Sequence, residues 1–238
     1  AARPDVVQFA MEQIIYAAAF CMAAANYMVS VALPLFLTEH RGAGPFLIGL
    51  AGLAGNLSYT AVAWAGSRNR TLHHRVPAFI PASLGIGICY LSLIFLPLPL
   101  AIACLVIDGV FYGRFWPSTQ NTLRLIRCSS DDGLFNIWWS GGVIAGSFTA
   151  GALYGIHPFL PFLLGGAFGV VTAAAAFTCR MAFPPPQSDP AGVASAAVQF
   201  FSARFIHRVR TLSFVHFTAV GALLFLFPRR GLDLGIAP

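Results

Sequence analysis

Two side chains of opposite charge lie within one apolar stretch of this chain, at about Leu100–Leu123: Asp108 and Arg114. A charge in such a stretch is costly unless it is paired or hydrated. Six residues at about 100° each place the two about 240° apart on a helix, so they do not pair with each other. We therefore expect Asp108 to bind a proton or a cation, and Arg114 to bind an anion or a substrate. The alternatives are a structural hydrogen bond or an interfacial position for Asp108, and snorkelling of Arg114 to the headgroups.

Uncharged polar side chains recur in the same apolar stretches and would suit a hydrated central cavity. They are Asn26, Tyr27, Ser30, Asn56, Ser58, Tyr59, Thr60, Tyr112, Gln120, Asn121 and Asn136. For each of them singly, a hydrogen bond between helices is the alternative interpretation. We expect Asn26 and Tyr27, together with Arg114, to face a substrate.

Few other residues offer chemistry. His216 is a candidate ligand for a metal or a chlorophyll-type pigment, although a packed histidine is the simpler interpretation. The five cysteines show no spacing pattern, so we predict no disulfide framework and no zinc site. The sequence has no nucleotide-binding glycine loop, nucleophile elbow or zinc-protease motif. We predict no catalytic residues, no enzyme activity and no cofactor, with pigment or lipid as the open alternatives.

The composition places the chain in a membrane. Hydrophobic residues make up 58% of it and charged residues 9%, against about 25% charged residues in soluble domains. Backbone groups inside a bilayer must be paired within the chain, so continuous apolar runs of about 20 residues are expected to be helices. The net charge is +6, but the arginines lie mostly in short loops, which indicates topology signals rather than nucleic-acid binding. The fold class predicted is all-α.

Seven apolar stretches are candidates for spans. They lie at about Val7–Leu37, Pro45–Gly66, Pro77–Leu96, Leu100–Leu123, Phe135–Tyr154, Phe159–Phe177 and Thr211–Phe227. We divide the chain accordingly into a six-span N-terminal bundle (1–184), a cytoplasmic linker with an amphipathic basic helix (185–210), a seventh span (211–228) and a short tail (229–238).

Arginine placement predicts the orientation. The loops after the second, fourth and sixth spans hold most of the arginines, so the positive-inside rule places the N-terminus in the cytoplasm. The expected location is the inner membrane of a bacterium. The pair Arg229–Arg230 then falls on the outer side, which suggests that the chain is truncated, frameshifted or partial.

The fourth and fifth stretches carry a family resemblance. The fourth contains Gly109-x-x-x-Gly113 followed by Phe115-Trp116-Pro117. The fifth opens with Phe135-Asn136 and Trp139-Ser140, and then has Gly142-x-x-x-Gly146 and Gly151. This resembles bacterial transporters of the major facilitator superfamily over about residues 8–184.

The resemblance has departures in two motifs. The proline of the fifth-span motif is Ser147 here, and one late glycine is Ala150. In the loop after the second span only Arg68 of the family motif remains, and its acidic gating residue is Ser67. By the resemblance, Gly142, Gly146, Gly151 and Arg68 would serve helix packing and gating.

The resemblance implies a fold and a function. The first six spans would form two inverted three-helix repeats, with a small solute bound near the membrane midplane and moved by alternating access. A six-span bundle leaves one seam exposed, which a second half, a second copy or other membrane subunits would cover. Two alternatives remain open: a non-transporting subunit of a larger complex, with pigment as one version, or a fragment of a twelve-span transporter.

Overall fold

The computed structural model describes residues 4–68, 78–127 and 133–178. These residues form six helices and no strand, so the prediction of an all-helical chain is confirmed for this part. The helices are α1 (Pro4–Arg41), α2 (Pro45–Arg68), α3 (Phe79–Leu93), α4 (Leu98–Arg127), α5 (Gly133–Ile156) and α6 (Leu160–Thr178). The predicted linker, seventh span, tail and His216 lie outside the described residues.

Four of the six helices are long and apolar enough to cross a membrane, as expected for a membrane protein. They are α1 over Gln8–Arg41, α2 over Pro45–Ala65, α4 over Leu98–Leu123, and α6 over Leu160–Thr178. Helix α3 is apolar but has only 15 residues. Helix α5 has 24 residues, but it is not one of the four helices that meet both the length and the apolarity expected of a membrane span.

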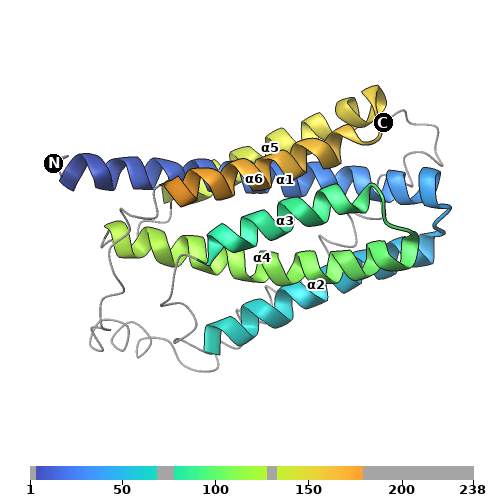
Figure 1. Cartoon of the computed structure of the whole chain (residues 1–238), viewed down its shortest axis with the longest axis horizontal. Helices are drawn as coiled ribbons and strands as arrows, with labels where there is room; N and C mark the ends of the chain where they lie inside the picture. The colour runs from blue at the N-terminus through green and yellow to red at the C-terminus, as the bar shows by residue number, and fades with distance from the viewer. Residues whose placement is uncertain (1–3, 69–77, 128–132, 179–238) are drawn as a thin grey trace.

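Successive helices run in opposite directions and form one elongated bundle (Figure 1). The most extensive contacts join α1 to α5, α2 to α4, and α3 to α6. Contacts of α1 with α6 and of α3 with α4 come next, and α1 meets α4 over a smaller area. Helix α1 is central, since 67% of its most apolar segment is buried, against 17% for α2 at the edge.

Glycine pairs bring the helices of two of these contacts close together. In α5, a Cβ atom on Gly142 or Gly146 would collide with the carbonyl oxygens of Phe20 and Ala24 on α1. In α4, a Cβ atom on Gly109 would collide with α2 at Gly55. Small residues spaced by four lie on one helix face and permit this approach of backbones.

Polar contacts fix the end of the bundle where α1 terminates. The Tyr154 hydroxyl of α5 donates a hydrogen bond of 2.7 Å to Oε2 of Glu39. The Arg41 guanidinium donates through Nη2 to the carbonyl oxygen of Ile94, also at 2.7 Å. The last turn of α1 is therefore joined both to α5 and to the residue that follows α3.

Candidate functional site

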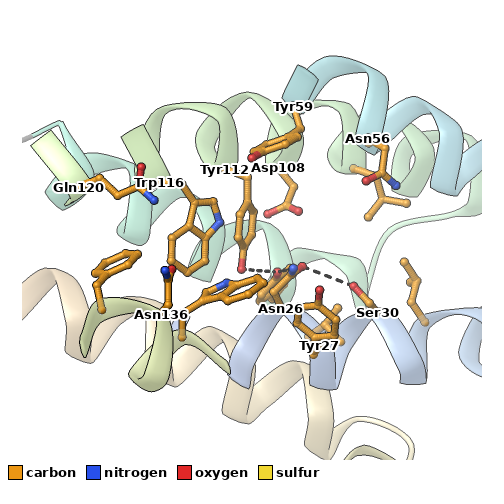
Figure 2. A pocket seen from close by; sticks show the side chains of 18 residues that line it. Asn26, Tyr27, Ser30, Asn56, Tyr59, Asp108, Tyr112, Trp116, Gln120 and Asn136 are labelled. Carbon is orange, nitrogen blue, oxygen red and sulfur yellow. Dashed lines mark hydrogen bonds between the residues drawn. The ribbon is translucent and has the colours of Figure 1, made fainter. Parts of the chain in front are cut away.

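A cleft of about 330 Å³ opens among α1, α2, α4 and α5, and Tyr90 of α3 also lines it. Figure 2 shows polar and aromatic side chains from these helices pointing into one space. The lining residues from α1 are Asn26, Tyr27, Val29, Ser30 and Leu33, and those from α2 are Gly55, Asn56 and Tyr59. Helix α4 contributes Leu105, Asp108, Gly109, Tyr112, Trp116 and Gln120, and α5 contributes Phe135, Asn136 and Trp139.

Helical periodicity explains why α4 supplies the largest share of the lining. Its residues Asp108, Tyr112, Trp116 and Gln120 are spaced by four, which places them along one face of the helix. The glycine at position 109 lies next to this face and lets α2 approach α4 closely. The cleft is therefore bounded by two helices that are packed backbone to backbone.

Asp108 carries the one carboxyl group among the described residues that line the cleft. Its side chain extends from α4 toward α1, opposite Asn26 and Tyr27 (Figure 2). Its Oδ1 atom is buried and has no hydrogen-bond partner among the residues that the structure describes. A buried carboxyl oxygen without a partner is energetically unfavourable, so this atom is placed to bind a group that the described residues do not provide.

Hydrogen bonds hold the wall beside Asp108 in place. The Tyr112 hydroxyl donates to the carbonyl oxygen of Met22 on α1 at 2.9 Å. The Tyr90 hydroxyl lies 3.3 Å from the Tyr112 oxygen and 3.4 Å from Oδ1 of Asn26, and its single proton serves one of the two. Ser30 also lies 3.4 Å from Oδ1 of Asn26. The network joins α1, α3 and α4.

An aromatic cluster closes the other end of the cleft. The Trp116 ring meets Phe135 and Trp139 of α5 edge to face, with centroids 6.3 and 6.5 Å apart. It also lies 6.3 Å from the Tyr112 ring. Edge-to-face contacts at such separations are favourable for aromatic rings. The cleft thus has a polar section around Asp108 and an aromatic section around Trp116, beside which the amides of Gln120 and Asn136 also lie (Figure 2).

The structure brings some of the predicted residues together and separates others. Asn26, Tyr27 and Asp108 line the cleft. Arg114 does not line it; its side chain is exposed. The angular separation of about 240° from Asp108 accounts for this difference, and it fits the snorkelling alternative for the arginine. Whether Arg114 contacts a substrate elsewhere on the protein stays a prediction.

The residues predicted for packing and gating also differ in position. Gly142 and Gly146 meet the backbone of α1, as described above. Gly151 lies half-buried further along α5. Arg68 ends α2, and its side chain is outside the described part of the structure. None of the three glycines lines the cleft.

Sequence reasoning passed over the apolar and aromatic side chains of the lining, among them Tyr90, Trp116 and Trp139. The spacing of eight between Asp108 and Trp116 was a usable signal, since it puts both on one helix face. Tyr90 had no such signal, because it belongs to a helix that is otherwise packed into the core. Within the described residues, no group of three His, Cys, Asp or Glu side chains is placed to hold a metal ion.

Comparisons with protein family models, with curated proteins and with solved structures find no match to this chain. Functional assignment therefore depends on the geometry of the cleft and on the motifs in the sequence.

Proposed function

We propose that this chain is a membrane transporter of the major facilitator type, or half of one, in the inner membrane of a bacterium. Its cleft would bind a small solute and open alternately to either side of the membrane. The observation that carries this proposal is the cleft itself, in which Asp108 has a buried oxygen without a partner. Such an intramembrane carboxyl group, facing the interior of a helical bundle, is typical of solute and ion pathways.

The pairing of helices supports an inverted-repeat architecture. If α1 is exchanged with α4, α2 with α5, and α3 with α6, the contact between α1 and α5 becomes the contact between α4 and α2. In the same way α1 with α6 becomes α4 with α3, while the α3–α6 and α1–α4 contacts are unchanged. Exchange of the two three-helix halves thus maps every major helix contact onto another major contact or onto itself. Two inverted three-helix repeats would have this property.

Accessibility of Ser30 to a thiol reagent tests alternating access without knowledge of the solute. Ser30 lines the cleft, and serine to cysteine is nearly isosteric. Ser30→Cys would be introduced after the five native cysteines have been replaced. A membrane-impermeant maleimide is expected to label it both in right-side-out and in inside-out vesicles, because a transporter exposes its cleft to each side in turn.

A matched control separates the cleft from the outer surface of the bundle. Thr149 of α5 is exposed and does not line the cleft, so Thr149→Cys should face lipid and resist the reagent in both vesicle types. Labelling of Ser30→Cys from one side only would contradict alternating access. Retention of melting temperature and elution volume would show that each variant is folded.

A second candidate function is that of a non-transporting subunit in a larger membrane complex. Large apolar side chains are exposed along α2 and α5, the two helices at the edges of the cleft. They include Phe46, Leu53 and Leu57 on α2, and Ile144 and Phe148 on α5. Partner helices or lipid would cover them. One-sided labelling of Ser30→Cys, together with polypeptides or pigment that copurify with the protein, would favour this function.

A further inference from the structure

The described lining of the cleft is acidic and rich in aromatic side chains. Asp108 supplies its one carboxyl group, and no arginine, lysine or histidine is among the described residues that line it. Aromatic rings make up much of the remaining wall. They include the rings of Tyr27, Tyr59, Tyr112, Trp116 and Trp139.

We propose that the cleft selects organic monocations: an ammonium group beside Asp108, joined to an apolar or aromatic body that packs against Trp116 and Trp139. The inference rests on the proposed function in that it takes the cleft to be a solute site. It adds the charge and the shape of the solute, which neither the helix arrangement nor the motifs specify.

The preference for a positive head group follows from electrostatics. A buried carboxylate is stabilised by an opposite charge nearby, and a second negative charge in the same cleft would be repelled. The rings of Tyr59 and Tyr112 line the same cleft as Asp108. The faces of such rings attract cations, more strongly in sites shielded from water. An ammonium group therefore gains from the carboxylate and from the rings, whereas an anion finds no basic partner among the described lining residues.

The preference for an apolar body follows from the layout along α4. Asp108 and Trp116 are eight residues apart, which is about 12 Å along a helix axis. Trp116 is held between Phe135 and Trp139 by edge-to-face contacts. A flat or flexible apolar group can pack against these rings, and a spacer of a few carbon atoms would join it to the ammonium group.

Three probes with the same body and different heads test the charge preference. They are (3-phenylpropyl)trimethylammonium, 3-phenylpropanol and 3-phenylpropanesulfonate. Binding to the detergent-purified full chain would be measured by titration calorimetry. A charged contact and a shielded cation–π contact change affinity by about tenfold or more. We expect the ammonium probe to bind at least that much more tightly than either of the others.

Variants then test which side chains contact the ammonium group and which contact the apolar body of the cation. Asp108→Asn should remove most of the advantage of the ammonium probe over the alcohol. Glu39→Gln should preserve it, because Glu39 lies outside the cleft and an amide oxygen can still accept the Tyr154 hydrogen bond. Trp116→Leu should weaken the binding of (3-phenylpropyl)trimethylammonium while leaving the binding of tetramethylammonium unchanged.

The outcomes separate this inference from the proposed function. Equal binding of the three probes to the wild-type chain, or tighter binding of the sulfonate, would overturn the cation preference, whatever the vesicle labelling shows. An ammonium preference that persists in Asp108→Asn would overturn the role of the carboxylate. Conversely, selective binding of the ammonium probe with one-sided labelling of Ser30→Cys would support the inference and refute transport. The comparison of head groups on the unmodified chain does not depend on whether any variant folds.

Discussion

Tyr112 on α4 donates a 2.9 Å hydrogen bond to the carbonyl oxygen of Met22 on α1. The two residues are 90 positions apart in the chain, and the bond crosses between the two helices that face each other over the cleft. Because α1 and α4 touch over a smaller area than α1 and α5 do, this bond is one of few direct links between them.

Tyr112→Phe should lower the stability of the bundle. The variant keeps the ring and removes only the hydroxyl group, so the expected loss is about 1 kcal/mol, the usual net value of a buried hydrogen bond. Chemical unfolding of the purified protein in detergent would measure it. Tyr27→Phe is the matched control, since no hydrogen bond of the Tyr27 hydroxyl occurs within the described residues. If the two variants lose the same stability, the Tyr112–Met22 bond has no special role.

Gly146→Ala should destabilise the contact between α5 and α1. A methyl group at this position would collide with the backbone of Ala24, and overpacking of this kind costs about 1–3 kcal/mol. Gly49→Ala is the control, because a Cβ atom on Gly49 in α2 would meet nothing within 4 Å. That second change should be neutral or stabilising by up to about 1 kcal/mol, as alanine favours the helix over glycine. If both changes shift the melting temperature in the same direction, the close packing of α5 against α1 is contradicted.

The bond between Tyr154 and Glu39 should show measurable coupling in a double-mutant cycle. Tyr154→Phe and Glu39→Ala each remove one partner of the 2.7 Å contact. A hydrogen bond to a carboxylate contributes about 1.5–3 kcal/mol, so the double variant should be less destabilised than the sum of the single variants. Unfolding free energies of the four proteins give the coupling. Strict additivity would mean that the contact adds nothing to the junction of α1 and α5.

The sequence could predict the helices because apolar length and glycine spacing are local properties. The predicted span Pro45–Gly66 corresponds to α2 (Pro45–Arg68), and the predicted span Phe135–Tyr154 corresponds to α5 (Gly133–Ile156). The four-residue spacing of Gly142 and Gly146 placed them on one face, and in the structure both meet α1. Boundaries differ by a few residues in both directions: α2 continues through the polar Ser67 and Arg68, whereas α3 is shorter than the predicted Pro77–Leu96.

The lining of the cleft was only partly predictable, because it depends on how each helix is rotated about its axis. Polarity within an apolar span identified Asn26, Tyr27 and Asp108, which do line the cleft. The same reasoning selected Arg114, yet its position on α4 turns it away from the other three. Tyr90 and Trp116 were passed over because aromatic residues in a span usually face lipid or core, and only the packing of neighbouring helices exposes them to the cleft.

Asp108→Asn should stabilise the empty protein while it abolishes gradient-driven uptake of a cationic solute. The variant replaces a carboxylate, whose buried Oδ1 has no described partner, by a neutral amide of the same shape. Ionisation of a carboxyl group buried without a partner is costly, and a neutral amide avoids this cost, so the change is expected to be neutral or stabilising by about 1 kcal/mol. Functional residues often reduce stability in this way, because the group that binds the ligand is unsatisfied without it. The unfolding free energy in detergent, together with uptake of (3-phenylpropyl)trimethylammonium into proteoliposomes, would measure both effects. A variant that is markedly less stable than the wild type would show instead that Asp108 is a structural residue of the bundle.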